Sequence, residues 1–176
     1  ALKQVKEVER ASLARYAELC KDAKYIPAKE YPKDQHPVWN VPCKLAFPSA
    51  TQNEVSGADA ANLIKNGCVL VCEGANMPST PDAIRIFQQH KLLYAPGKAA
   101  NAGGVATSGL EMTQNSIRLT WSPEEVDAKL KSIMQNIHAV CVRYGTQSDG
   151  YINYVVGANI GGFMKVANAM LAQGCV

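Results

Sequence analysis

The chain of 176 residues has little net charge and no obvious targeting or membrane signal. Its formal charge at pH 7 is +3 and the basic residues are scattered, so nothing favours binding to nucleic acid. No apolar run approaches the length that spans a bilayer and no signal-peptide pattern opens the chain, so we expect no membrane partner. The first residue is Ala1 rather than methionine, and we therefore expect a fragment or a processed chain.

Cysteine and histidine patterns that would indicate a disulfide framework or a metal site are also missing. Six cysteines lie far apart or inside apolar runs, and none makes a Cys-x-x-Cys pattern: Cys20, Cys43, Cys68, Cys72, Cys141 and Cys175. We expect reduced thiols in a cytoplasmic protein, with disulfides as the less favoured alternative. The three histidines do not cluster in sequence with the cysteines, and we expect no metal site.

The motifs of common nucleotide-binding and hydrolytic enzymes are absent as well. No Gly-x-Gly-x-x-Gly follows a strand, no residue that reads the adenine ribose follows it, and no Walker loop is present. Neither a paired carboxylate motif nor a Ser-His-Asp arrangement can be recognised. The residues alone therefore identify no general acid, base or nucleophile.

Short apolar runs alternate with helical patterns through the middle of the chain. We expect strands at Cys43–Phe47, Cys68–Cys72 and Leu92–Ala95, and helices that begin after Ser56 and Thr80. This alternation predicts an α/β fold with a parallel sheet and right-handed helical crossovers. The run Cys68–Cys72 is continuously apolar, which favours a strand buried on both faces.

We expect helices on both sides of the predicted sheet, and an irregular connection between the first helix and the sheet. Leu2–Cys20 has helical periodicity, and a proline-rich surface connection follows, which we expect Tyr25, Tyr31 and Trp39 to hold in place. We expect the last third of the chain to be helical as well.

Two long helices are predicted after residue 120. Trp121–Val126 combines a serine cap, a proline at the first helical position and a glutamate partner, and the apolar stripe that follows ends near Tyr144. We interpret this stripe as packing rather than as a cofactor site. A final helical segment within Asn153–Ala172 contains small residues, including Gly157 and Gly161, that allow close helix contact or a kink.

The stretch Gly97–Met112 is the most distinctive in the chain. Its glycine pair would leave backbone N–H groups uncovered at the start of a helix beginning near Gly104, a position that favours an anion or an amide carbonyl. Val105, Ser108 and Met112 would share one face, with the Ser108 hydroxyl in the first turn. The alternative is a strand-to-helix turn with a packed small residue.

Three polar loops follow the predicted strands and should meet at one edge of the sheet. These loops are Ser49–Asn53, Glu73–Pro78 and Gly97–Val105, and ligands of open parallel sheets bind beyond the carboxyl ends of the strands. Their amide side chains suit amide and ribose hydroxyl groups better than bare phosphate: Gln52, Asn53, Asn76 and Asn101. The alternative for each asparagine is a turn residue.

Four strings resemble the hexameric glutamate dehydrogenases, most closely the small-subunit microbial type that is often NADP-dependent. They are colinear with that family over nearly the whole chain: Pro48–Glu54, Glu73–Pro78, Pro96–Met112 and Asn153–Gly174. The resemblance implies the C-terminal part of a longer chain with a partial Rossmann-like sheet followed by C-terminal helices. Residues 1–120 would belong to the nucleotide-binding domain, and residues 121–176 would return toward a substrate domain.

The resemblance also implies roles for individual residues. Ser108 would contact the substrate's side-chain carboxylate with Val105 as a neighbouring wall, and the residues near the nicotinamide would be Ala50, Thr51, Gln52, Asn76 and Asn101. No catalytic residue carries over, because the family's catalytic lysine and aspartate match no part of this sequence.

The implied reaction is the reversible NAD(P)-dependent oxidative deamination of L-glutamate to 2-oxoglutarate and ammonia. NADP is the expected cofactor, with NAD as an alternative, in a cytoplasmic homohexamer, and this chain alone is expected to be inactive. A leucine or phenylalanine dehydrogenase would want an apolar wall where Ser108 stands. The rival from another class is a non-catalytic nucleotide-binding or interaction module, which the missing glycine fingerprint favours.

Overall fold

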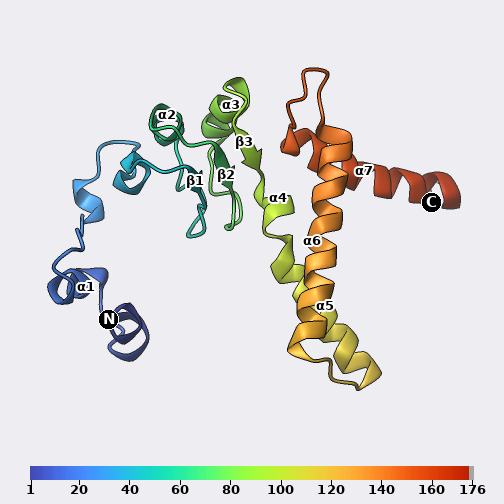
Figure 1. Ribbon diagram of the computed structural model, residues 1–176, viewed down its shortest axis with the longest axis horizontal. Coiled ribbons are helices and arrows are strands. Elements are labelled where there is room, and N and C mark those ends of the chain that lie inside the picture. The colour runs from blue at the N-terminus through green and yellow to red at the C-terminus, as the bar shows by residue number, and fades with distance from the viewer. Residues whose placement is uncertain (175–176) are drawn as a thin grey trace.

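The computed structural model describes residues 1–174 and shows a small α/β unit between an extended N-terminal segment and an arm of long helices (Figure 1). The elements in chain order are η1 Gln4–Val8, α1 Leu13–Leu19, η2 Ala28–Glu30, η3 Pro37–Asn40, β1 Leu45–Ala46, α2 Gly57–Lys65, β2 Leu70–Cys72, α3 Pro81–Gln89, β3 Leu93–Ala95, α4 Gly97–Ala100, α5 Ala102–Ile117, α6 Pro123–Gly145 and α7 Tyr154–Gln173. The predicted α/β class is confirmed.

The sheet has three parallel strands in the order β1-β2-β3. Leu45 pairs with Leu70, which in turn pairs with Leu93, so the strands are in register across the sheet. Because right-handed crossovers between strands in this order leave from the same face, α2 and α3 both cover one side of the sheet. These two helices also pack on each other.

The core lies between the sheet and these two helices. Ala46, Val71 and Tyr94 are buried in adjacent strands, and they meet Leu63 of α2 and Phe87 of α3. The rings of Phe87 and Tyr94 lie 5.4 Å apart between centroids. Burial of these large apolar side chains is the main source of stability in the α/β unit.

The other face of the sheet is open in this chain. Leu45, Phe47 and Leu93 are exposed, and Val69 beside β2 is 51% exposed. The prediction of a strand buried on both faces is therefore wrong for Cys68–Cys72. The segment is apolar throughout, but α2 and α3 both cover the same face of the sheet, so the other face stays exposed.

The N-terminal segment departs from the prediction. The expected helix over Leu2–Cys20 is divided into η1 and α1, and Arg10 between them has a left-handed φ of 51°. Since Val5 is the one residue buried in these two elements, tertiary packing gives a continuous helix little support. Tyr25 and Tyr31 are exposed, although the Tyr31 ring lies 5.7 Å from the His36 ring between centroids, and Trp39 is bound to the α/β unit. Its indole N–H donates to the Glu54 carbonyl at 2.9 Å.

The two long helices begin at or near the predicted positions. Ser122 and Glu125 form the capping box of α6, and α6 ends at Gly145. A Cβ atom on Gly157 would lie 2.1 Å from the Cys141 carbonyl oxygen, and one on Gly161 would lie 2.4 Å from a methyl group of Val140. The small residues therefore permit close contact between α6 and α7, which confirms the first of the two predicted roles.

One helix, α7, has the length and apolar composition of a membrane-crossing segment, with a mean hydropathy of 1.3. By length and composition alone, this helix contradicts the prediction that no apolar run approaches membrane-spanning length. Only 6% of that stretch is buried, and Phe163, Val166 and Leu171 are exposed. Core helices of larger soluble proteins pass the same test, and exposed apolar patches of this kind mark interaction surfaces.

Candidate functional site

The third predicted loop is helical. Residues Gly97–Ala100 form α4, and α5 begins at Ala102, two residues before the predicted helix start. Alanine is the strongest helix former, and Pro96 supplies an extended entry into the turn. A Cβ on Gly103 would contact Leu130 of α6 at 3.4 Å, so this glycine allows helix packing rather than an exposed backbone turn.

Two of the predicted residues meet at the edge of the sheet. The Asn101 amide nitrogen donates to the Asn76 side-chain oxygen at 2.7 Å and to the Ala75 carbonyl at 3.2 Å. Asn101 stands at the junction of α4 and α5, while Asn76 lies in the loop after β2. The side-chain NH₂ of Asn76 and the side-chain oxygen of Asn101 make no hydrogen bond to another side chain within residues 1–174. Each can therefore bind a ligand group.

The loop after β1 adjoins the same pair. The backbone N–H groups of Ala50 and Thr51 donate to the Glu54 carboxylate at 2.8 and 3.3 Å, which holds the loop in shape. A shallow polar pocket of about 610 Å³ lies between this loop and the next, and its lining comprises Ser49, Ala50, Thr51, Gln52, Gly74, Ala75 and Asn76. The three cofactor residues predicted from this loop are exposed and face the Asn76 loop across this pocket.

Asn53 is a turn residue, which was the alternative to a ligand-binding role. Its φ is 56°, in the left-handed region, and its N–H donates to the Met77 carbonyl at 3.1 Å. It acts as a turn residue that connects the first two loops.

Ser108 and Val105 lie farther along α5 and do not contact the Asn76–Asn101 pair. Ser108 is in the second turn rather than the first, because α5 begins earlier than predicted. Positions 101, 105, 108 and 112 nevertheless share one helix face, and Ser108 lies about 10 Å along the axis from Asn101. This face is open: Ser108 is exposed and Val105 is 75% exposed.

A buried carboxylate behind the asparagine pair was missed by sequence reasoning. Glu73 is 3% exposed and accepts hydrogen bonds from the Tyr94 hydroxyl at 2.6 Å and from the Gly97 N–H at 2.7 Å. Burial, followed by the bond to Glu73, raises the pKa of Tyr94, so the phenol stays protonated and donates. The available signal was a lone acidic residue directly after a buried apolar strand.

A second cavity, of about 410 Å³, borders this carboxylate. Its polar lining includes Glu73, Tyr94 and Ser79, and Ile84 and Val155 supply apolar walls. Asn76 also lines this cavity, which lies between the loop after β2 and the helices α3 and α7.

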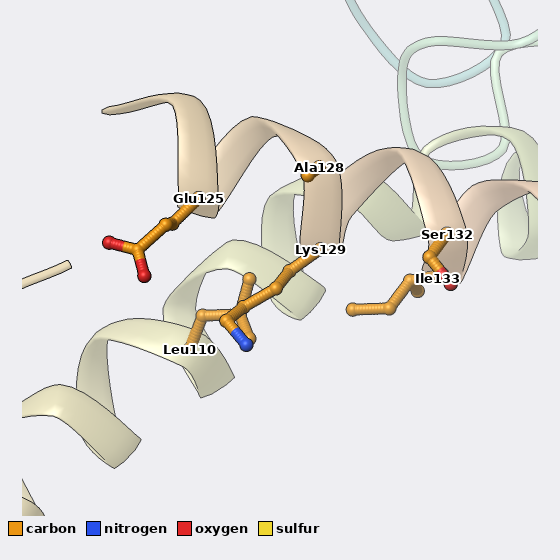
Figure 2. Close-up of a pocket in the computed structure, with 6 residues that line it drawn as sticks. All are labelled: Leu110, Glu125, Ala128, Lys129, Ser132 and Ile133. Carbon is orange, nitrogen blue, oxygen red and sulfur yellow. The ribbon is translucent and has the colours of Figure 1, made fainter. Parts of the chain in front are cut away.

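Another groove lies away from all of these residues, between α5 and α6. It is lined by six residues, including Leu110 of α5 and Glu125, Lys129 and Ile133 of α6 (Figure 2). The Lys129 ammonium lies 4.5 Å from the Trp121 ring centre, which is a cation–π contact. The groove holds none of the predicted site residues.

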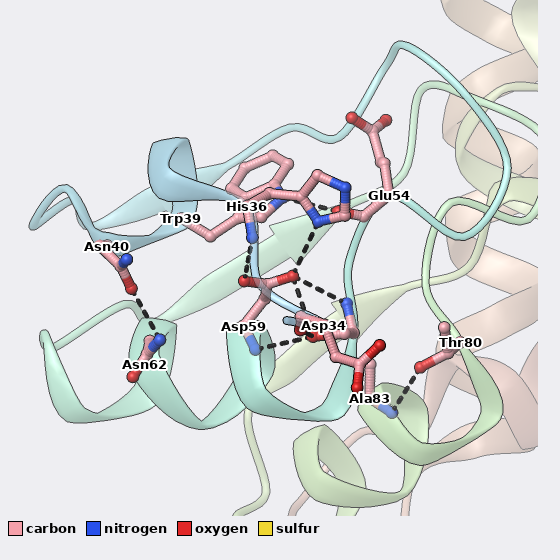
Figure 3. Close-up of polar contacts among 10 residues, drawn as sticks. Asp34, His36, Trp39, Asn40, Glu54, Asp59, Asn62, Thr80 and Ala83 are labelled. Carbon is pink, nitrogen blue, oxygen red and sulfur yellow. Dashed lines mark hydrogen bonds and ion pairs between the residues drawn. The ribbon is translucent and has the colours of Figure 1, made fainter. Parts of the chain in front are cut away.

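A second buried carboxylate, Asp59, lies at the start of α2 and has a different task. It accepts the His36 N–H at 2.9 Å, contacts the His36 ring at 3.1 Å and closes a capping box with Ser56 (Figure 3). The Ser56 hydroxyl also donates to the Asp34 carbonyl. This cluster attaches the N-terminal segment to the α/β unit and includes neither asparagine of the pair.

The thiols and acidic side chains are also possible metal ligands in the part that the structure describes. Among residues 1–174 no group of three or more His, Cys, Asp or Glu side chains could hold a metal ion. Five cysteines are free, and Cys175 lies outside the described residues. Burial raises the pKa of the Cys68, Cys72 and Cys141 thiols, which lowers their reactivity.

Known proteins are similar to this chain in sequence and fold. A glutamate dehydrogenase of Bacteroides thetaiotaomicron is 60% identical over 173 residues, which are 98% of this chain and 37% of that protein. An NADP-specific glutamate dehydrogenase of Helicobacter pylori is 53% identical over 98% of this chain and 39% of its own length. The solved structure of Plasmodium falciparum glutamate dehydrogenase matches with a TM-score of 0.86 and 47% identity, over 98% of this chain and 36% of that one.

These matches confirm the resemblance that the four sequence strings indicated. The chain spans well under half the length of each relative named above. The sequence pattern of the glutamate/leucine/phenylalanine/valine dehydrogenases covers residues 1–174. The chain therefore belongs to the glutamate/leucine/phenylalanine/valine dehydrogenase family.

Proposed function

We propose that this chain acts within a longer glutamate dehydrogenase subunit, which converts L-glutamate reversibly to 2-oxoglutarate and ammonia. NADP is the proposed cofactor, with NAD as an alternative, because relatives are named NADP-specific in Helicobacter pylori and NAD(P)-specific in Xylanibacter ruminicola. The observation that carries the proposal is the Asn76–Asn101 pair at the carboxyl edge of the sheet. A cytoplasmic homohexamer is the proposed assembly.

The nicotinamide end of the cofactor would lie against the asparagine pair. The unused Asn76 NH₂ and Asn101 carbonyl complement the acceptor and donor of a carboxamide or a ribose hydroxyl. Ala50, Thr51 and Gln52 would border the same nucleotide from the opposite side of the shallow pocket. When bound, the cofactor accepts hydride from the substrate.

The substrate would lie along the open face of α5. Ser108 would donate its hydroxyl to the side-chain carboxylate of glutamate, and Val105 would contact the aliphatic part of that side chain. Residues of this chain thus bind and orient the reactants, while proton transfer depends on groups outside it. Orientation of this kind contributes strongly to the rate, because the reacting atoms must be held in line.

We assign two regions of the chain to different domains of the longer subunit. Residues 1–120 belong to the nucleotide-binding domain, and residues 121–176 return toward the substrate domain. The exposed apolar side chains of α7, among them Phe163 and Leu171, support the second assignment because such a surface needs a packing partner. The contact between α5 and α6 supports a proposed substrate site close to the start of this second region.

Two alternatives make different predictions. A leucine or phenylalanine dehydrogenase would require an apolar pocket wall at Ser108, and the exposed hydroxyl there favours glutamate. A non-catalytic module would bind nucleotide without turnover. Assays of the longer subunit with glutamate, leucine and phenylalanine distinguish these proteins, and glutamate-dependent NADP reduction by residues 1–176 alone would contradict the view that catalysis needs further groups.

The residue-level test is Ser108→Ala in the longer subunit. Loss of a hydrogen bond to a charged group predicts an increase of about tenfold or more in KM for glutamate, with the KM for NADP changed by less than about twofold. Ser116→Ala, at an exposed serine two turns further along α5, is the matched control and should change neither constant. An equal or larger effect of Ser108→Ala on NADP would remove Ser108 from the substrate site.

A further inference from the structure

We propose that Glu73 is a positioning residue whose buried carboxylate sets the geometry of the Asn76–Asn101 pair. The proposal rests on the function proposed above, because it assigns the pair to the nicotinamide end of the cofactor. Glu73 itself lies behind the pair and is 3% exposed, so it acts through other residues rather than by touching the reactants.

The carboxylate connects the two segments that carry the asparagines. One oxygen accepts from the Tyr94 hydroxyl at 2.6 Å and from the Ser79 N–H at 3.3 Å, and the other accepts from the Gly97 N–H at 2.7 Å. Ser79 follows the loop that carries Asn76. Glu73 therefore fixes the end of one segment and the beginning of the other.

The short helix α4 transmits this position to Asn101. The Asn101 N–H donates to the Gly97 carbonyl at 2.9 Å, so these two residues are the ends of a single helical turn. At Gly97 a Cβ would lie 2.8 Å from the Ala75 carbonyl oxygen, the same oxygen that accepts from the Asn101 amide. A shift of Gly97 away from Glu73 would therefore move Asn101 relative to Asn76.

A carboxylate is the group that these surroundings require. It offers acceptors on both oxygens, and the neighbours that face it present two backbone N–H groups and one hydroxyl. Glutamine at this position would turn its NH₂ toward either the Gly97 N–H or the Ser79 N–H. A backbone N–H cannot reverse its direction, so one buried donor would lose its acceptor.

The chain contains a matched control in Asp59. It is also fully buried and also accepts backbone N–H groups, those of His36 and Ser56, but it joins the N-terminal segment to α2. Asp59→Asn thus removes a comparable buried charge, one that makes no hydrogen bond to α4, Asn76 or Asn101. Comparison of the two variants separates positioning from general destabilisation.

The experiment uses the longer dehydrogenase subunit with Glu73→Gln, Asp59→Asn and Gly97→Ala. Loss of one buried hydrogen bond predicts that Glu73→Gln weakens NADP binding about tenfold and lowers kcat, with the KM for glutamate raised less than the KM for NADP. Gly97→Ala should reproduce this pattern with the carboxylate intact, because its methyl group pushes α4 from Ala75. Asp59→Asn should leave the Kd for NADP within about twofold.

The outcomes are distinguishable. Equal changes in NADP binding for Glu73→Gln and Asp59→Asn, or unchanged binding in both Glu73→Gln and Gly97→Ala, would overturn the positioning role. If Glu73→Gln does not fold, unchanged NADP binding by Gly97→Ala overturns it alone. A wild-type subunit without glutamate-dependent NADP reduction would instead overturn the proposed function.

Discussion

The α/β unit and the α6–α7 helix pair are held together in different ways. In the α/β unit, large side chains such as Phe87, Tyr94 and Leu63 interlock between sheet and helices. In the helix pair, glycines bring the backbones together, while large apolar side chains such as Phe163 point outward. The α/β unit therefore carries its own core and the Asn76–Asn101 pair at its edge, whereas the helix pair leaves an apolar surface exposed.

The same substitution in the two regions should sharpen this contrast most. Phe87→Ala removes a fully buried ring and is expected to lower the free energy of unfolding of the chain by about 4 kcal/mol. Phe163→Ala, at a side chain that is 67% exposed, should change it by less than about 0.5 kcal/mol. Urea denaturation followed by circular dichroism measures both, and similar losses would show that α7 is packed against something within the chain.

Glycine substitutions within α7 provide the next largest contrast. Gly157→Ala forces a Cβ to within 2.1 Å of the Cys141 carbonyl oxygen, so α6 and α7 must separate. We expect a loss of about 3 kcal/mol in the free energy of unfolding and faster hydrogen exchange in both helices. Gly162→Ala is the control, since nothing lies within 4 Å of its Cβ position, and it should be neutral or stabilising. A harmless Gly157→Ala would disprove the close approach.

The smallest effect concerns the hydroxyl of Tyr94. Tyr94→Phe removes one donor from Glu73, and we expect the free energy of unfolding to fall by about 1 kcal/mol at pH 7. Burial raises the pKa of Tyr94 in the folded chain, so this tyrosine stabilises the fold fully below the pKa of the unfolded chain, near 10.0. Above that pH the unfolded tyrosine ionises first, and the advantage of the wild type over Tyr94→Phe should shrink. A difference that grows with pH would contradict this burial.

Local signals predicted much of the framework. The starts of α2, α3 and α6 follow from Ser56, Thr80 and Ser122, because a cap involves contacts only three residues apart. The meeting of Asn76 with Asn101 followed from strand order, since parallel strands end at one edge. The roles of Ser108, Val105 and the Ala50–Gln52 loop stay predictions that the Ser108 and NADP-binding experiments address.

Other features depended on partners distant in sequence. The helical turn Gly97–Ala100 was taken for a loop because four residues contain too little periodicity to identify. Its start is fixed by Glu73, which lies 24 residues earlier in the chain. The break at Arg10 likewise reflects how little the N-terminal helices pack on the rest of the chain.

The sequence by itself determined the order of strands and helices, their caps and the family, because these depend on neighbours within a few residues or on long matched strings. Tertiary structure alone decided which face of each element is covered. The apolar residues of the sheet and of α7 look equally suited to burial in sequence, yet Tyr94 is buried while Leu93 and Phe163 are exposed. Burial depends on which surfaces are close in space. The apolar pattern of a segment shows only that the segment is suited to burial.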